Sequence, residues 1–405
     1  MQNIYECCCG IDVHKKLIVA CLKNGRKAEL RNFDTVTRSI KELANWLIEN
    51  KCQMIAMEST GSYWKPIYNI FELLGLNVIV VNAQHIKTVP GRKTDVKDAE
   101  WIAELLKHGL LKSSYIPDKE QRELREIVRY RKSLIEERSR ELNRLEKTLQ
   151  GANIKLSSFV SEITGTSARN LIEQALVGEV NEDNISNFIH SSLKADKSEL
   201  LKAMEGVFSP IQKHLVRAIL DHIDDMTKRI KDLDDIINNH MDKYDDAIKK
   251  VDVLPGIAKR SAEVILAEIG IDMSRFPSEA HISSWSGLCP GNNESAGKRK
   301  SGKTNKGNKH LKSILIQCAK SAQKVKSSFF YAQYQRIVVR RGSNRATVAV
   351  AHSMLIAIYH ILKNNISFKD LGSDYHTKFN VNAKANYYIR KLQELDIQLP
   401  VSVNA

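Results

Sequence analysis

The sequence lacks the features of a disulfide-bonded, zinc-binding or membrane-spanning protein. Its seven cysteines include no Cys-x-x-Cys pair, and Cys7, Cys8 and Cys9 are adjacent, so in a strand their side chains point to alternate faces. Buried free thiols in a reducing cytosol are the simpler interpretation. No apolar stretch reaches the roughly 18 residues of a membrane span, and the first residues do not resemble a signal peptide. We therefore expect a cytoplasmic protein with no membrane partner.

Acidic residues are in the minority, and the basic excess is concentrated in one segment. The 405 residues carry a formal net charge of +15 and are 42% hydrophobic, enough for two or three domains. Residues 291–350 contain 14 lysine or arginine residues and a single acidic residue. Aromatic residues in or beside this segment are Trp285, Phe329, Phe330, Tyr331 and Tyr334. Clustered cations with aromatics favour nucleic-acid binding over a merely solvated lysine-rich surface.

The first 115 residues have the pattern of an α/β domain. Short apolar or alternating runs predict strands within residues 7–35, with a hairpin turn at Asn24-Gly25, and further strands in CQMIAME and NVIVVN. Helical patterns occupy residues 36–50, the segment YWKPIYNIFELLG and residues 95–110. Three early strands followed by alternating helices and strands predict a mixed sheet.

Two heptad-like runs predict long helices between the two ends of the chain. The first run steps by four and three through Leu124, Val128, Arg131, Ile135, Arg138, Leu142, Leu145 and Leu149. The second contains Ile219, Ile223, Met226, Ile230, Leu233 and Ile237. This spacing is typical of coiled-coil-like helices, although two arginines interrupt the first seam. The two helices could pack on each other or on a second subunit. An ordinary helical hairpin, without coiled-coil packing, is the other alternative.

A Pro255-Gly256 turn precedes a helical run that ends at Gly270. Backbone N–H groups at such a helix start can hold a phosphate. The turn is either a helix-hairpin-helix-like element, with Ala258 in place of a second glycine, or an ordinary helix start. The glycines and lysines of residues 291–309 predict a flexible cationic loop, followed by a helix from about His310.

Four carboxylates in the first quarter of the chain form a pattern typical of metal-dependent nucleases. Asp12 and Glu58 each end an apolar run, where an unpaired carboxylate is costly. Asp95 and Asp98 lie three residues apart at the start of a helical pattern and share one face. Oxygen ligands suit Mg²⁺, and paired metal ions can clamp a phosphate during displacement. We predict that the four side chains converge on one Mg²⁺ site.

A second chemical candidate is Ser295, in the segment PGNNESAGKRKSGK. A serine hydroxyl among cations can attack a phosphodiester and form a phosphoserine link that conserves bond energy for rejoining. The residues alone do not select Ser295 over Ser286 or Ser301. Tyr331 and Tyr334 are comparable nucleophiles.

Several motifs together resemble the IS110 family of DEDD-type insertion-sequence transposases. GIDVHKK, MESTGSYW and KTDVKDAEWIAELL are similar to its N-terminal motifs. VLPGIAKRSAEVILAEIG, WSGLCPGNNESAGK and TNKGNKHLKSILIQCA are similar to its C-terminal domain, so the resemblance spans about residues 9–365. It implies a RuvC-like, RNase H-like fold at the N-terminus. The Mg²⁺ ligands that it implies are Asp12, Glu58, Asp95 and Asp98.

The resemblance also implies a serine nucleophile in the C-terminal domain. Counting from Pro290, that serine falls on Ser295, although Ala296 separates it from Gly297, where many members have serine directly before glycine. Family members are recombinases guided by a structured non-coding bridge RNA, of which one loop pairs with target DNA and another with donor DNA. They assemble as dimers and tetramers.

The resemblance therefore defines an expected organisation. We expect a RuvC-like DEDD domain in residues 1–115 and a helical, coiled-coil-like linker region in 116–250. A mainly α-helical transposase domain with the serine loop follows in 251–365, and a C-terminal tail in 366–405. The residues expected to contact nucleic-acid phosphates are Lys298, Arg299, Lys300, Lys303, Lys306, Lys309, Arg336, Arg340, Arg341 and Arg345.

We thus expect a Mg²⁺-dependent DNA transposase that cuts and rejoins double-stranded donor and target DNA through a covalent serine–DNA intermediate. A non-coding guide RNA would be its partner, in a homodimer or tetramer on the nucleoid of a bacterial or archaeal cytoplasm. One alternative is a Holliday-junction resolvase that uses the same acids with water as the nucleophile. The other is a non-catalytic RNA- or DNA-binding protein on an inactive nuclease fold.

Overall fold

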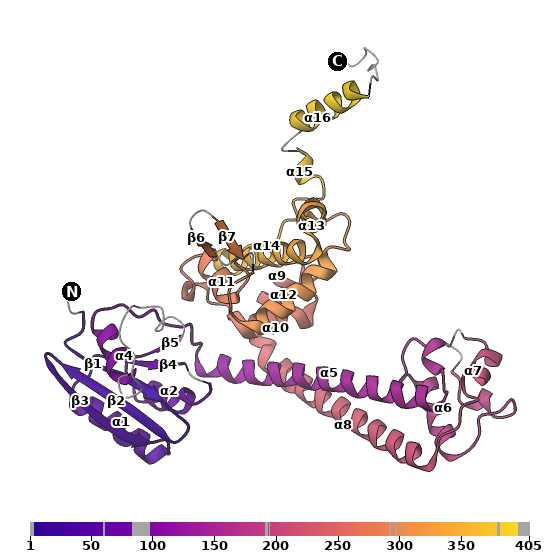
Figure 1. Cartoon of the computed structure of the whole chain (residues 1–405), viewed down its shortest axis with the longest axis horizontal. Helices are drawn as coiled ribbons and strands as arrows, with labels where there is room; N and C mark the ends of the chain where they lie inside the picture. Colours follow the sequence, from indigo (N-terminus) through magenta and orange to yellow (C-terminus); the bar gives the residue numbers. More distant parts are fainter. Residues whose placement is uncertain are drawn as a thin grey trace. The chain divides into compact units, whose positions relative to one another are not determined.

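A computed structural model describes the chain in two compact units, Met1–Arg122 and Glu123–Ala405 (Figure 1). The described residues are 4–59, 61–82, 98–190, 193, 195–290, 293–295, 298–301, 303–378 and 381–395. Each unit is described by itself below. The finer division with boundaries after residues 115, 250 and 365 stays a prediction.

The first unit contains a five-stranded mixed sheet in the order β3-β2-β1-β4-β5. Its strands are β1 (Cys7–Val13), β2 (Leu17–Asn24), β3 (Lys27–Asp34), β4 (Met54–Glu58) and β5 (Val78–Val81). The first three are antiparallel neighbours, whereas β4 is parallel to β1 and β5 is parallel to β4. The hairpin expected at Asn24-Gly25 is confirmed, with Gly25 in the left-handed region at φ +60°. The predicted mixed sheet is therefore present.

Helices cover both faces of this sheet. Helices α1 (Thr37–Glu49) and α2 (Trp64–Leu73) lie on one face, and α4 (Asp98–Lys107) lies on the other (Figure 1). Alternate residues of β1 serve the two layers, because strand side chains alternate in direction. Cys9 packs with the α1 and α2 layer, and Cys8 packs with α4. All seven cysteines are free thiols, as the sequence predicted.

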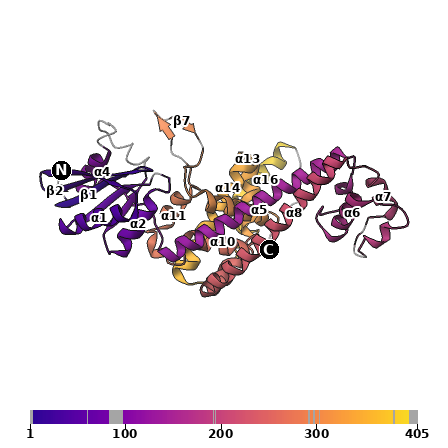
Figure 2. The same ribbon diagram turned by 90° about the horizontal axis from the view of Figure 1, so that it is seen from below.

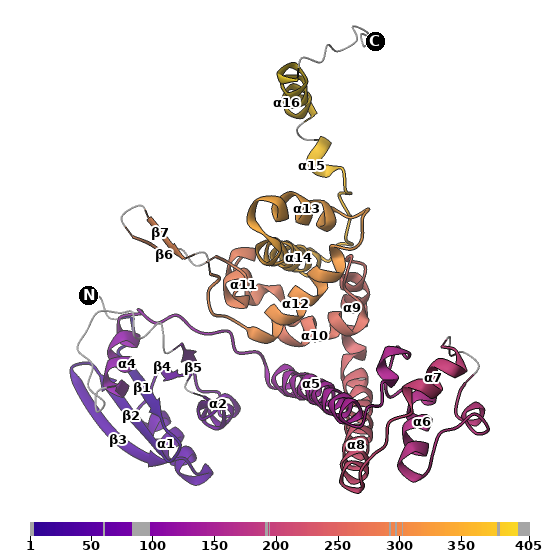
Figure 3. The same cartoon turned by 45° about the vertical axis from the view of Figure 1, so that its right-hand side comes forward.

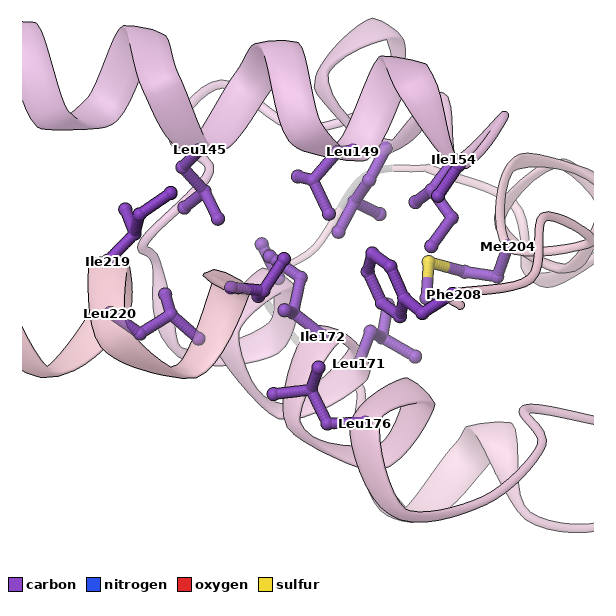
Figure 4. Packing of buried hydrophobic residues seen from close by; sticks show 14 of the residues in the cluster. Leu145, Leu149, Ile154, Leu171, Ile172, Leu176, Met204, Phe208, Ile219 and Leu220 are labelled. Atoms are coloured by element: carbon purple, nitrogen blue, oxygen red, sulfur yellow. The ribbon is translucent and has the colours of Figure 1, made fainter. Parts of the chain in front are cut away.

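Two long helices of the second unit lie side by side and antiparallel (Figure 2). They are α5 (Lys119–Gly151), which starts in the first unit, and α8 (Pro210–Met241). Between them come η2 (Leu156–Ser158), α6 (Thr166–Val177), η3 (Ile185–Asn187) and α7 (Lys197–Ala203). Leucine, isoleucine, methionine and phenylalanine side chains from these elements form one core at the end of the helix pair (Figure 4).

The predicted contact of the two long helices with each other is present. The two arginines of the first seam meet α8: Arg131 Nε donates to Asp234 Oδ1 at 2.6 Å, and Arg138 Nε donates to Thr227 Oγ1 at 2.8 Å. One predicted seam position is wrong, because Ile135 is 37% exposed while Leu134 is buried. Other seam positions of α5 are buried as predicted, among them Leu124 and Val128 in its N-terminal half.

The rest of the second unit is a helical bundle (Figure 3). Its elements are η4 (Asp242–Tyr244), α9 (Asp245–Asp252), α10 (Lys259–Ile269), η5 (Met273–Arg275), α11 (Glu279–Ser286), α12 (Lys309–Ala322), α13 (Phe329–Arg341), α14 (Ser343–Asn364), α15 (Tyr375–Lys378) and α16 (Val381–Glu394). Contrary to our expectation for apolar stretches, one described helix, α14, is long and apolar enough to cross a membrane. Its packing against α11, α12 and α13 identifies it as the central helix of the bundle.

Candidate active site

Two predicted carboxylates stand at the same end of neighbouring parallel strands. The last residue pair between β1 and β4 is Ile11 with Met57, and Asp12 and Glu58 each follow directly. Because strand side chains alternate, both residues take the sheet face that Cys8 and Ala56 occupy, which is the face covered by α4. Asp12 is 8% exposed, so its charge lies in a largely desolvated position.

The third predicted carboxylate reaches the same end because α4 runs antiparallel to β1. Ile4, just before β1, donates its backbone N–H to the carbonyl of Lys107 at the end of α4, at 2.9 Å. Gly10, near the other end of β1, lies against the backbone of Ala99 in the first turn of α4. Asp98 is the first residue of α4 and therefore stands at the Asp12 end of the strand.

The fourth predicted carboxylate, Asp95, lies outside the described residues. Among the residues that are described, no group of three His, Cys, Asp or Glu side chains is close enough together to hold a metal ion. The convergence of the four acids on one Mg²⁺ site therefore stays a prediction. The donor chemistry fits such an ion, since three carboxylates share one end of the sheet and oxygen donors suit Mg²⁺.

One neighbour of this site has a defined contact that the sequence did not reveal. His14 Nε2 lies 3.0 Å from Asp12 Oδ2, and the His14 side chain is 60% exposed. The two residues are separated by one position at the end of β1, where the chain turns toward β2. In the sequence, the only indication of this contact is that His14 follows two residues after Asp12.

The segment that contains Ser295 has regular structure. Strands β6 (Asn293–Ser295) and β7 (Lys298–Ser301) pair antiparallel, with Ser295 opposite Lys298 (Figure 3). An isolated bridge between Pro290 and Thr304 continues the pairing below the hairpin. The expectation of a flexible loop is thus wrong for these residues, because the two ends of the segment are held in pairing register by the helices that carry them. The helix expected from about His310 starts at Lys309.

The two ends of the segment cross at a pair of glycines. Gly287 ends α11 at φ +73°, and a Cβ on Gly307 would lie 2.3 Å from the Gly287 nitrogen. Asn308 donates its backbone N–H to the Trp285 carbonyl at 3.0 Å, and Asn305 donates to the Cys289 carbonyl at 3.2 Å. We call these paired ends, residues 285–290 and 304–308, the neck. Only glycine permits so close a crossing of two backbones.

A buried charge cluster lies under the neck. Glu268, with a side chain 1% exposed, accepts two hydrogen bonds from Arg129, Nε to Oε1 and Nη2 to Oε2, both 2.7 Å long. Asn308 Nδ2 donates to Glu268 Oε2 at 2.6 Å. Burial alone raises the pKa of Glu268, but Arg129, Asn308 and Arg125 outweigh it and hold that pKa below its usual range. We did not identify this cluster from the sequence, where the only signal is a glutamate inside the apolar run VILAEIG.

The alternative nucleophiles differ in accessibility. Ser286 is fully buried, and its Oγ donates to the Ser283 carbonyl at 2.8 Å, which argues against a role in attack on DNA. Tyr334 Oη lies 3.1 Å from Ser343 Oγ. The backbones of Ser295 and Ser301 lie in the hairpin, and their side chains lie outside the description.

The predicted phosphate contacts are exposed wherever their side chains are described. Exposed positions are Lys303, Lys306, Lys309, Arg336, Arg340, Arg341 and Arg345. The backbones of Lys298, Arg299 and Lys300 form most of β7, and their side chains are not described. Arg336 Nη1 donates to His376 Nδ1 at 3.1 Å. Burial and then the Arg336 charge hold the pKa of His376 below its ordinary value.

Two aromatic residues in or beside the basic segment take part in packing between helices. Phe330 is 2% exposed and stacks on Phe368 with ring centroids 6.0 Å apart. Trp285 packs against Phe276, with centroids 5.5 Å apart, and the Arg125 guanidinium lies 5.5 Å from its ring centroid. Phe330 is therefore not accessible for base stacking, whereas Trp285 is half-buried.

The Pro255-Gly256 turn packs closely on α12. Gly256 has φ +85°, and a Cβ there would lie 2.4 Å from the Ala322 nitrogen and the Cys318 carbonyl oxygen. The close approach of the two backbones is sufficient to explain why residue 256 is a glycine, so the glycine is not evidence for a bound phosphate. Whether α10, which starts just after the turn, also receives a phosphate in the manner of a helix-hairpin-helix element stays a prediction.

Comparisons with known proteins find two family matches along the chain. Residues 9–154 match the DEDD transposase family of IS110, and residues 249–335 match the transposase family IS116/IS110/IS902. The first match contains all four predicted acids, and the second contains Ser295.

Relatives extend the likeness over most of the chain. The transposase for insertion sequence element IS1111A of Coxiella burnetii is 22% identical over 369 residues, 89% of this chain and 87% of that protein. A probable family 20 transposase of Pseudomonas aeruginosa is 23% identical over 367 residues, 89% of this chain and 94% of that protein. Putative transposase y4qE of Sinorhizobium fredii is 31% identical over 133 residues, 31% of this chain and 34% of that protein. The chain belongs to the IS110 family of transposases, enzymes that cleave and rejoin DNA.

Proposed function

We propose that this transposase performs Mg²⁺-dependent strand transfer with carboxylates of its first unit and the Ser295 hydroxyl of its second unit. The observation that carries the proposal is the placement of Asp12 and Glu58 on neighbouring parallel strands, with Asp98 at the same end of the sheet. A mixed five-stranded sheet with acids at this end is compatible with the RNase H-like fold that a DEDD domain implies.

The carboxylates Asp12, Glu58, Asp95 and Asp98 would hold the metal ion. When bound, Mg²⁺ supplies positive charge that polarises the scissile phosphate and stabilises the charge that develops on it. Like charges gathered at one end of a sheet repel each other without a counter-ion, and Asp12 is nearly buried. The cost of that arrangement supports a cation site here.

Ser295 would form the covalent intermediate. Its Oγ forms a bond to phosphorus as the bond to the departing strand breaks, and the hydroxyl proton passes to the departing oxygen. After strand exchange, the free hydroxyl of the partner strand attacks the same phosphorus and releases the serine. The antiparallel hairpin supports this role, because it holds the Ser295 backbone in a defined register next to basic residues.

The partners follow from the charge and from the family. The exposed cations of the second unit, among them Lys306, Arg340 and Arg341, support contacts with phosphates of donor DNA, target DNA and a structured guide RNA. Recognition of sequence by a bridge RNA, and assembly as a dimer or tetramer through the α5 and α8 pair, remain parts of this proposal. The expected setting is the nucleoid of a bacterial cytoplasm.

The test is a denaturing gel with the purified full-length protein, Mg²⁺, RNA from the flank of the element and labelled junction DNA. We expect a covalent protein–DNA band that disappears in Ser295→Ala and persists in Ser286→Ala, since Ser286 is buried. A band that survives Ser295→Ala would show that another residue is the nucleophile.

The same experiment separates the alternatives. A resolvase with a water nucleophile would cut junction DNA without forming any covalent band, and it leaves the matched residues 249–335 without a task. A non-catalytic binding protein would behave identically with Asp12→Asn, whereas the proposed enzyme loses cleavage.

A further inference from the structure

Among the described residues, the hairpin that carries Ser295 is joined to the helical bundle through the neck. The two sides of the neck are joined by backbone hydrogen bonds from Asn308 to Trp285 and from Asn305 to Cys289. Above them come the Pro290–Thr304 bridge and the β6–β7 pair. A displacement of the neck therefore moves the base of the hairpin.

Asn308 is the residue at which the neck joins the bundle. Its Oδ1 accepts hydrogen bonds from the backbone N–H groups of His310 and Leu311, at 3.0 and 3.1 Å, and so caps α12. Its backbone N–H belongs to the neck, and its Nδ2 donates to Glu268. One side chain thus ties the helix start and the neck to a carboxylate on α10.

Glu268 is held rigidly for this contact. Both carboxylate oxygens of Glu268 accept hydrogen bonds from Arg129, which lies 139 positions earlier in the chain. The Glu268 side chain is almost completely buried. Arg125 Nε donates to the Ala267 carbonyl at 3.3 Å, which fixes the end of α10 that carries Glu268. Since the pKa of Glu268 is lowered, the acceptor is ionised at neutral pH, and charge-assisted hydrogen bonds are the stronger kind.

We propose that Glu268 is a positioning residue for strand transfer, which acts through Asn308 to hold the neck and hence Ser295 in place. The inference rests on the proposed role of Ser295 as the nucleophile. Correct placement of a reacting group contributes much of the rate enhancement, and a displacement of about 1 Å lowers the reaction rate roughly 100-fold. Loss of the contact between Glu268 and Asn308 should therefore reduce the chemical step far more than it reduces DNA binding.

The decisive variants change the donor and the acceptor of the hydrogen bond from Asn308 to Glu268. Asn308→Asp keeps a good N-cap for α12 but sets a carboxylate against Glu268. Glu268→Gln removes the charge. The double variant Glu268→Gln/Asn308→Asp restores a donor and an acceptor between these two positions in reversed order; the new glutamine keeps one oxygen to accept from Arg129 Nε and gives up only the bond from Arg129 Nη2. Glu263→Gln is the matched control, because Glu263 lies on the same helix, is 2% exposed and pairs with Arg260.

Three measurements are made on the full-length protein: the rate of covalent band formation, the affinity for labelled DNA, and hydrogen–deuterium exchange of the peptide that covers the neck. We expect Asn308→Asp to slow band formation by roughly 100-fold, to leave affinity within about twofold, and to speed exchange at Asn305 and Asn308. The double variant should recover most of the rate. Glu263→Gln should lower the melting temperature without faster exchange in the neck.

The proposal is overturned if the double variant is as slow as Asn308→Asp, or if exchange in the neck is the same in all variants. If Glu268→Gln alone fails to fold, the comparison of Asn308→Asp with the double variant still decides. Failure of the proposed nucleophile has a different signature, namely a covalent band that persists in Ser295→Ala while exchange in the neck still responds to Asn308→Asp.

Discussion

Gly10 of β1 and Ala103 of α4 are in backbone contact, so that a Cβ on Gly10 would lie only 2.3 Å from the Ala103 nitrogen. This contact sets the distance between the helix that starts at Asp98 and the strand that carries Asp12. A residue without a side chain is therefore part of the architecture of the candidate metal site.

Gly10→Ala should push α4 away from the sheet. Overpacking of this kind costs about 1–3 kcal/mol in the free energy of unfolding, and it should reduce Mg²⁺-dependent cleavage because Asp98 moves relative to Asp12. Urea unfolding and a cleavage assay measure the two effects. Gly151→Ala is the control, since a Cβ there meets only Gln212 Nε2 at 3.7 Å. Equal activity of the two variants would contradict the role of this contact.

Asp12→Asn should abolish cleavage and covalent band formation while the protein stays folded. An amide is a poorer ligand for Mg²⁺ than a carboxylate, and a loss of at least about 100-fold is expected for a residue that helps to place stabilising charge. Cleavage at several Mg²⁺ concentrations and a thermal melt are the measurements. Asp34→Asn, at the exposed end of β3, should retain activity. Full activity of Asp12→Asn would rule out the metal site.

Glu268 should make stability depend on pH in the acid range. Its folded-state pKa lies below the ordinary value of 4.5, so the unfolded chain binds more protons there and stability falls as the pH decreases below that value. Above it, the contribution is fully present. Glu268→Gln should flatten this part of the curve of unfolding free energy against pH. An unchanged slope between wild type and variant would contradict the assignment.

Individual cations of the second unit should contribute separately to nucleic-acid affinity. Replacing one lysine that contacts a phosphate reduces the slope of log K against log salt by about 1. Lys306→Gln should show this reduction, because Lys306 is an exposed residue of the neck. Lys249→Gln serves as the control, since Lys249 pairs with Asp245 on α9. Filter binding at four salt concentrations provides the slopes, and identical slopes for Lys306→Gln and wild type would exclude this contact.

The sheet cysteines should resist alkylation in the native protein. Burial raises the pKa of Cys8 and Cys21 to about 11 and that of Cys52 to about 12, so little thiolate exists at neutral pH. Mass spectrometry after a short iodoacetamide pulse should find these thiols unmodified, and modified after unfolding in guanidinium. Rapid native labelling of Cys8 would mean that the sheet opens readily.

Several features could be predicted from the sequence because their signals are local. Alternation and turn residues placed the strands of the first unit and the Asn24-Gly25 hairpin. Heptad spacing predicted the two long helices, with contact between them as one of two alternatives, and the motifs identified the family. A strand or helix period extends over neighbouring residues, so it can be recognised before any fold is known.

Other features depended on contacts between distant segments. The burial of Phe330 under helix packing removed one aromatic from the predicted nucleic-acid surface, and the pairing of β6 with β7 arises from ends held together by α11 and α12.

The sequence by itself determined the family and the basic segment and predicted the four acids, because residue type and spacing carry that information. Only the tertiary structure decided that α4 brings Asp98 to the end of β1 and that Glu268 reaches Asn308. Such contacts join residues tens of positions apart, and no local pattern encodes which of many buried or charged residues will meet.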